Sequence, residues 1–255
     1  MGTPLPTGFV GHGSPVNALG GAVADAWARW GEALERPTAV LVVSAHFEAQ
    51  PPTLTASSPL PLVYDFWGFP EEMYRILYAA PAALRVSNLV EGLLGAEVRR
   101  DEERGLDHGA WVPLSVMFPD ADVPVVQLSI PWTDDPARML DLGRRLAPLR
   151  DDGVFILGSG NIVHNLRRVD WSGGPTPGWA EEFDGWAAET LRSGDAPLLA
   201  DYRAHGLAGV CHPTHEHFVP LLVAAGASGE HDEISFPVTG FELGSVSSRA
   251  VQLGR

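Results

Sequence analysis

The chain has 255 residues, of which 45% are hydrophobic and 19% are charged, and its formal net charge is −15. This composition is typical of a folded globular protein with a sizeable core, and it excludes a disordered chain. Every basic residue is an arginine, and so acidic a surface argues against nucleic acid or an anionic membrane as a partner.

The cysteine count, the N-terminal sequence and the length of the apolar runs bear on where the protein resides. Cys211 is the single cysteine, so no intramolecular disulfide can form. The N-terminus has no signal-peptide pattern, and no apolar run is long enough to span a bilayer. We therefore expect a cytoplasmic protein with a single domain over residues 1–255; the sequence does not indicate its oligomeric state.

In the N-terminal half, two predicted strands each lead to a histidine. Residues 8–11 read as a short strand that ends in a glycine turn carrying His12. Residues 39–44 form an uninterrupted apolar run, which is typical of a strand buried on both faces, and His46 follows it. Helices are predicted at residues 22–34, 70–78 and 82–94, and another around Pro113.

The alternation of strands and helices continues to the C-terminus. Strands are predicted at residues 123–130, 154–157, 234–238 and 243–251. Helices are predicted from a cap at residues 134–136 to Leu149, after a cap at Asn161, and at residues 179–191. A last helix should begin at residue 216 or 217, with Pro220 in its first turn, and end at Gly226. This order predicts an α/β fold with a mostly parallel central sheet flanked by helices.

Five histidines share one kind of position. His12 and His46 follow predicted strands, whereas His108, His164 and His217 lie at or near predicted helix starts. In α/β folds such positions meet at the carboxyl edge of the sheet, where ligands bind. Neutral imidazoles that converge there are typical ligands of a first-row metal. Any one of them alone would more often be a structural histidine, and His108 and His164 also suit acid–base roles.

Two further features have a structural alternative. Residues 211–217 hold three histidines and one carboxylate, which is also the composition of a histidine-rich surface loop. Aromatic residues gather at Tyr64, Phe66 and Trp67, with Trp111 downstream, and they predict a wall around a planar ligand. Ordinary core packing explains the same aromatic residues. We expect His205, His215 and His231 to lie on the surface.

The chain resembles the 4,5-DOPA extradiol dioxygenase-like family of the class III extradiol superfamily, which includes the catalytic subunit of protocatechuate 4,5-dioxygenase. The resemblance extends from about residue 8 to residue 245 and rests on five motifs: VSAHFE at 43–48, YDFWGFP at 64–70, GLDHGAW at 105–111, GSGNIVHN at 158–165 and HPTHEHF at 212–218. It implies one α/β domain, one divalent non-haem metal, and opening of a DOPA-like catechol by O₂.

The resemblance also implies roles for individual residues. His12, His46 and His217 match metal ligands, His164 matches an acid–base residue, and His108 matches a residue that contacts the substrate hydroxyls. His212 also lies near the metal in the resemblance, so either His212 or His164 could be a fourth ligand. Glu216 is adjacent to His217 and could supply a carboxylate ligand or lie behind the ligands. The third ligand is a carboxylate in the wider superfamily, and His215 stands where the family motif has a proline.

The metal decides between two chemistries. Ring opening needs a redox-active metal, so Fe(II) is expected for activity, whereas three histidines also suit Zn(II). A zinc-dependent hydrolase or lyase, or a non-catalytic metal-binding interaction protein, is therefore the alternative function on the same site.

Overall fold

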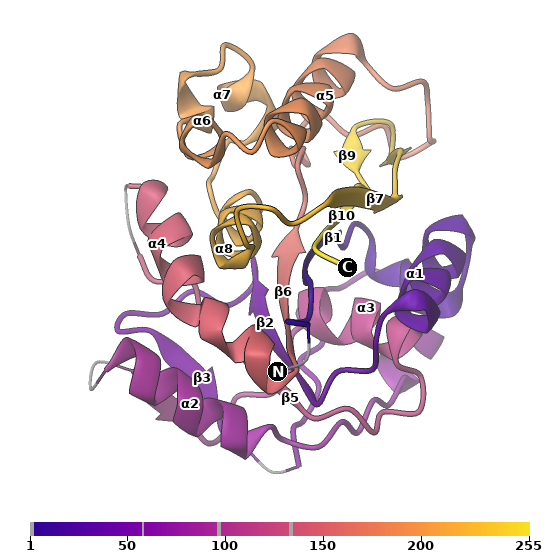
Figure 1. The fold of residues 1–255 in the computed structure, drawn as a ribbon. Helices are drawn as coiled ribbons and strands as arrows, with labels where there is room; N and C mark the ends of the chain where they lie inside the picture. The colour runs from indigo at the N-terminus through magenta and orange to yellow at the C-terminus, as the bar shows by residue number, and fades with distance from the viewer. Residues whose placement is uncertain (1–2, 58, 96–97, 133–134) are drawn as a thin grey trace.

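A six-stranded sheet runs through the centre of the computed structural model, which describes residues 3–57, 59–95, 98–132 and 135–255 (Figure 1). Its strands in spatial order are β5 (Val125–Gln127), β2 (Ala39–Ser44), β6 (Val154–Gly160), β1 (Thr7–Gly11), β10 (Ala250–Leu253) and β7 (Ile234–Val238). The first four are mutually parallel, and β10 is antiparallel to both β1 and β7. The predicted single α/β domain with a mostly parallel sheet is confirmed.

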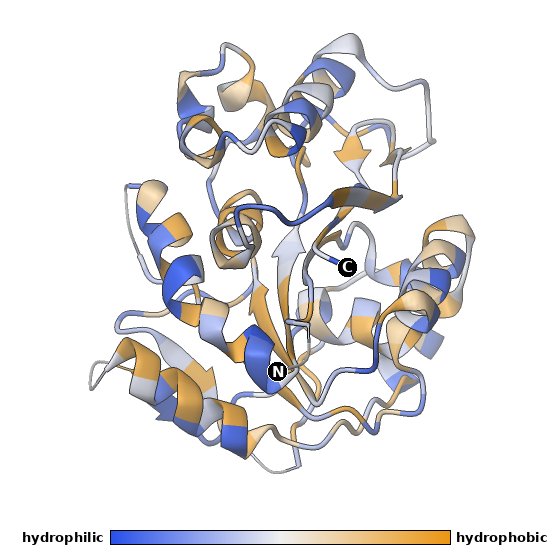
Figure 2. Ribbon diagram, viewed as in Figure 1, coloured by the Kyte–Doolittle hydropathy of each residue, from blue (hydrophilic) through white to orange (hydrophobic). Residues whose placement is uncertain are grey.

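Both faces of the sheet are covered, which explains why its inner strands are mostly apolar. On β2, Leu41 and Val43 pack into one hydrophobic cluster, whereas Val40 and Val42 pack into a second cluster on the opposite face. Figure 2 shows hydrophobic residues along these strands and hydrophilic residues on the outward sides of the helices. A strand buried on both faces has no position at which water would favour a polar side chain.

The helices form layers around the sheet. Those of the described residues are α1 (Ala22–Ala33), α2 (Leu84–Leu94), α3 (His108–Met117), α4 (Ala137–Leu146), α5 (Gly178–Arg192), α6 (Ala196–Ala200), α7 (Ala208–Cys211) and α8 (Val219–Ala227), with 3₁₀ turns at Pro15–Leu19, Glu71–Arg75, Ala147–Asp152 and Tyr202–Ala204. Helices α8 and α4 cover one face, and α1 and α3 cover the other. None of these helices has both the length and the apolar character that crossing a bilayer requires.

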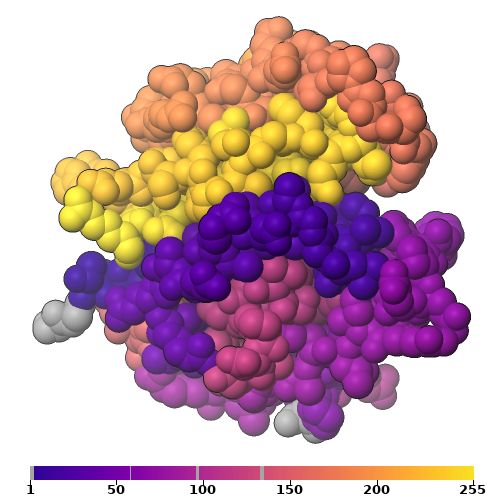
Figure 3. Space-filling view, turned by 90° about the vertical axis from the view of Figure 1, so that its right-hand side faces the viewer, coloured from indigo at the N-terminus to yellow at the C-terminus, as the bar shows by residue number. Residues whose placement is uncertain are grey.

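The carboxyl edge of the sheet lies under a cap of later chain. Strand β6 points toward α5 and toward β9 (Val246–Ser247), which pairs with β8 (Phe241–Glu242) (Figure 1). In Figure 3 the C-terminal segment forms a yellow band between the N-terminal residues and the α5–α7 region. The remaining short strands, β3 (Thr53–Thr55) and β4 (Arg99–Asp101), pair beside the main sheet.

The prediction of a helix that carries His164 is wrong. Strand β6 continues to Gly160, and residues 161–167 form an irregular loop. Asn161 caps no helix, because its side chain donates instead to Ser247 O at 2.9 Å. Gly158 and Gly160 are needed for packing, since a Cβ at Gly158 would overlap the Pro220 carbonyl of α8 and a Cβ at Gly160 would overlap the His217 carbonyl before α8.

Several boundaries also differ from the sequence predictions. Residues 71–75 form a 3₁₀ helix, and the strand expected at 243–251 is divided into β9 and β10. Helix α3 begins at His108, so Pro113 lies inside it, whereas α8 begins at Val219 with Pro220 in its first turn as predicted. Asp134 of the predicted α4 cap lies outside the described residues.

The close packing of α4 on α8 yields a stability prediction. A Cβ at Gly226 would overlap Leu140 O of α4, so Gly226→Ala should destabilise the fold by about 1–3 kcal/mol. Gly92→Ala in α2 is the matched control, because nothing lies within 4 Å of its added Cβ, and it should be neutral or stabilising. Urea denaturation measures both, and equal midpoints would contradict this account of the α4–α8 contact.

Candidate metal centre

Three histidines meet above the end of β6. His12 follows β1 and His46 follows β2, the two neighbours of β6 in the sheet, while His217 precedes α8. Each offers a ring nitrogen, and the three nitrogens lie within 4.8 Å of one another. The Nε2 atoms of His12 and His46 are 3.2 Å apart, and Nε2 of His217 is buried without a hydrogen-bond partner.

The chemistry of this donor set fits a divalent cation. Burial lowers the pKa of His12 and of His217 well below the usual value. Burial, together with the charge of the neighbouring His108, lowers the pKa of His46 to about 4. All three rings are therefore neutral at neutral pH, with lone pairs available. Two nitrogens bound to one metal at about 2.0–2.1 Å lie about 3 Å apart, in agreement with the His12–His46 distance. A cation would also satisfy the buried His217 nitrogen, which is otherwise costly.

The other ring nitrogen of each histidine faces a polar side chain. Nδ1 of His217 donates to Glu216 Oε1 at 2.9 Å, and Thr214 donates to the same oxygen. Nδ1 of His46 lies 3.7 Å from Asp65 Oδ2. Nδ1 of His12 lies 3.0 Å from a serine hydroxyl on β6. Partners of this kind orient metal-binding imidazoles.

His108 is held beside the three histidines by Asp65. Its ring lies 4.0 Å from that of His46, and its Nδ1 donates to Asp65 Oδ1 at 2.8 Å. Burial raises the pKa of Asp65, but the hydrogen bond and charge of His108 outweigh that effect and lower it. Asp65 is therefore an ionised partner that the sequence predictions missed. Its one signal was an acidic residue within an aromatic segment.

His164 lies directly against His217. The two rings are stacked, with centroids 3.4 Å apart and planes 9° from parallel. His164 also offers a ligand atom within 4.8 Å of those of Glu216 and His217. Burial lowers its pKa to about 4, so this imidazole is neutral in the resting site.

His212 is not among the histidines whose ring nitrogens converge. Its Nε2 donates to Ile162 O at 2.6 Å, and its ring packs against Phe218. Burial lowers the pKa of His212 to about 4. His215, expected on the surface, is half-buried with its Nε2 3.2 Å from Glu48 Oε1.

The four aromatic residues of the predicted pocket occupy different environments. Phe66 lies edge-on to His108, with ring centroids 5.8 Å apart. Tyr64 lies between Phe66 and Trp111 and donates its hydroxyl to Ile76 O. Trp111 is fully buried, whereas Trp67 is 85% exposed. Phe66 is thus the member in ring contact with the histidine group.

A buried carboxylate supports the site from below. Asp107 is fully buried and accepts from Ser44 Oγ at 2.7 Å and Gln127 Nε2 at 2.8 Å. It also caps α3 by accepting from Ala110 N. These bonds connect the ends of β2 and β5 to the helix that carries His108, and they compensate the buried charge.

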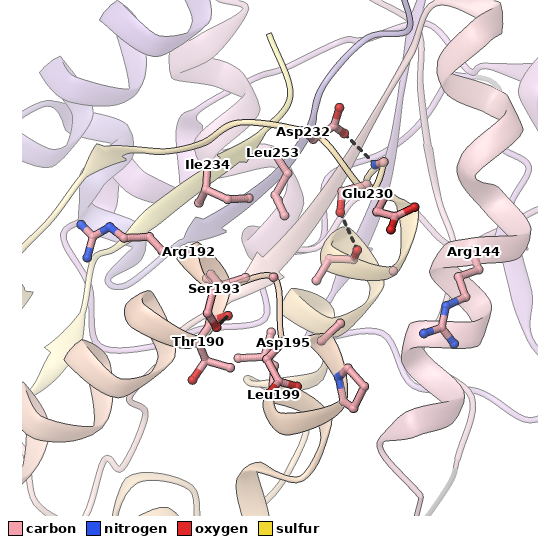
Figure 4. Close-up of a pocket in the computed structure, with 18 residues that line it drawn as sticks. Arg144, Thr190, Arg192, Ser193, Asp195, Leu199, Glu230, Asp232, Ile234 and Leu253 are labelled. Carbon is pink, nitrogen blue, oxygen red and sulfur yellow. Dashed lines mark hydrogen bonds between the residues drawn. The ribbon is translucent and has the colours of Figure 1, made fainter.

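A separate cavity is lined by other residues. It has a volume of about 580 Å³ and is bordered by the α5–α6 junction, the end of α8 and β7 (Figure 4). Arg144, Arg192 and Asp195 are among its lining residues, and none of the nine histidines is. Its lining therefore has no part in the histidine chemistry.

Known proteins are similar to this chain in sequence and in fold. Residues 12–251 match the family described as the catalytic LigB subunit of aromatic ring-opening dioxygenase. The 4,5-DOPA dioxygenase extradiol of Escherichia coli (strain K12) is 41% identical over 99% of this chain and 96% of its own length. The protein of that name from Beta vulgaris is 38% identical over 89% of this chain and 88% of its own length.

A solved structure agrees with these relatives. The crystal structure of an uncharacterized protein from Escherichia coli K12 superimposes with a TM-score of 0.84 at 36% identity, and the match covers 98% of this chain and 100% of that one. A match of this extent concerns the whole domain, including all the segments that carry the histidine group. The chain belongs to the LigB family of class III extradiol dioxygenases and is an aromatic ring-opening dioxygenase.

Proposed function

We propose that this enzyme opens a DOPA-like catechol with O₂ at one divalent metal held by His12, His46 and His217. The observation that supports this most is the convergence of their ring nitrogens, one of which is buried without a partner. The relatives named 4,5-DOPA dioxygenase extradiol support the substrate class. We propose Fe(II) as the active metal, because it can pass electrons between catechol and O₂, and Zn(II) as an inactive occupant.

His164 is the proposed acid–base residue. Catechol binding at a metal requires loss of hydroxyl protons, and ring opening requires a proton later. Burial keeps His164 neutral, so its ring can accept a proton, and the nearby Glu216 carboxylate favours the protonated form. The imidazole can then return that proton to the opened product.

His108 is the proposed contact for a substrate hydroxyl. Because its Nδ1–H is bonded to Asp65, the ring orientation is fixed and Nε2 is the nitrogen left to meet the substrate. Phe66 supports an aromatic wall beside His108, and we propose that Tyr64, Trp67 and Trp111 extend or back that wall. Glu216 and His212 are proposed to act from behind the ligands, since each is already bonded to another group.

The direct test is anaerobic loading with Fe(II) followed by a panel of catechols with and without an amino-acid side chain. We expect DOPA to give a yellow ring-opened product with uptake of one O₂ per ring. The protein loaded with Zn(II) is the control and should give no product, because Zn(II) has no accessible redox chemistry. Absence of product and of O₂ uptake with every catechol in the Fe(II)-loaded enzyme would overturn the proposal.

A further inference from the structure

We infer that Ser159 is a positioning residue that fixes which nitrogen of His12 carries the proton, and so directs the His12 Nε2 lone pair toward His46 and His217. Ser159 lies near the end of β6, fully buried, paired with Val10 of β1 and Ser44 of β2. The consequence for metal binding rests on the proposed metal site. The assignment of the proton itself does not.

Ser159 donates its hydroxyl hydrogen to helix α3. Ser159 Oγ lies 2.5 Å from the backbone carbonyl oxygen of Gly109, which can only accept. In a regular helix that carbonyl would accept from the N–H four residues later, but this residue is Pro113, which has none. Ser159 therefore satisfies a buried carbonyl that the proline leaves free.

The proton of His12 follows from this arrangement. Nδ1 of His12 lies 3.0 Å from Ser159 Oγ, and this oxygen has no second hydrogen to donate. Nδ1 must therefore be the donor. A neutral imidazole has only one N–H, so its Nε2 carries the lone pair. That nitrogen is the one 3.2 Å from Nε2 of His46.

Gly109 makes the three-way contact possible. A Cβ on this residue would lie 3.2 Å from His12 Nδ1, 3.1 Å from His46 Cδ2 and 2.5 Å from Ser44 Oγ. The bare glycine lets the first turn of α3 approach both strand ends closely enough for its carbonyl to reach Ser159. Gly109 thus lets its carbonyl come close, Pro113 leaves that carbonyl without a donor in the helix, and Ser159 donates to it.

Loss of the Ser159 hydroxyl should allow the His12 proton to move from Nδ1 to Nε2. In Ser159→Ala the buried Nδ1–H would have no acceptor, so the other tautomer, with Nε2–H donated to His46, becomes favourable. That tautomer competes with metal binding. We expect the affinity for Zn(II) or Co(II), measured against a chelator, to fall about 10–100-fold, the usual effect of losing a partner of a metal ligand.

The decisive measurement is the tautomer in the metal-free protein. Long-range ¹H–¹⁵N correlation spectra at neutral pH should show His12 as the Nδ1–H form in the wild type and a growing Nε2–H form in Ser159→Ala, with the His12 signals assigned by their loss in His12→Gln. Ser87→Ala is the matched control, because Ser87 is a buried serine in α2 whose hydroxyl lies 3.4 Å from a carbonyl of its own helix. The control should keep the wild-type tautomer and metal affinity.

The comparison of Ser159→Ala with Ser87→Ala decides the inference. An unchanged His12 tautomer in Ser159→Ala, with metal affinity equal to that of Ser87→Ala, would overturn it. If the alanine variant does not fold, Ser159→Cys decides, since its weaker acceptor should give an intermediate mixture of tautomers. A wild-type protein that binds no metal would refute the proposed metal site, whereas the tautomer comparison would still test Ser159.

Discussion

His217→Ala is expected to abolish stoichiometric metal binding and to reduce ring-opening activity to background, while the fold is retained. The variant removes one of three converging ring nitrogens, and the two that remain cannot hold the cation in place. The fold should survive because the lost Nε2 has no hydrogen-bond partner in the protein. Metal content of the purified variant, with far-ultraviolet circular dichroism for the fold, measures both parts.

His12→Ala and His46→Ala should behave in the same way. His231→Ala is the matched control, because His231 is exposed in the turn before β7, and it should keep full metal content. Full metal content in His46→Ala or His217→Ala would show that the ligand set is assigned incorrectly.

His164→Ala should slow turnover by about 10²–10⁴-fold while metal and catechol still bind, since this is the usual contribution of general acid–base catalysis. The ring of His164 stacks on His217 instead of bonding to it, so its loss leaves the three proposed ligands in place. Metal stoichiometry and single-turnover rate should be measured on one preparation. Loss of metal together with activity would instead identify His164 as a fourth ligand.

His108→Ala provides the contrast. Its imidazole is oriented by Asp65 and is proposed to meet the substrate, so this variant should raise the catechol dissociation constant more than it lowers the single-turnover rate. Equal effects of the two variants on binding and on rate would contradict the separate roles of His108 and His164.

Local patterns in the sequence predicted the architecture well. The run from Ala39 to Val43 is apolar at every position because both faces of β2 are covered, and the pattern alone revealed this burial. His12 and His46 were placed by the same reasoning, since strands that run parallel bring their ends to one edge. Pro220 was expected in the first turn of its helix and lies there.

The tertiary structure decided what depends on contacts between distant segments. The strand predicted at residues 154–157 continues through Gly158 and Gly160, and these two positions are glycines because α8 and the segment before it approach too closely for a side chain. His212 and His217 lie five residues apart in one motif, yet one bonds to Ile162 O and the other joins His12 and His46. The roles of Asp65 and Ser159 have no sequence signature, because a hydrogen-bond partner is selected by position in space. Periodicity records which faces are buried; which polar atoms meet is settled only when the strands and helices pack.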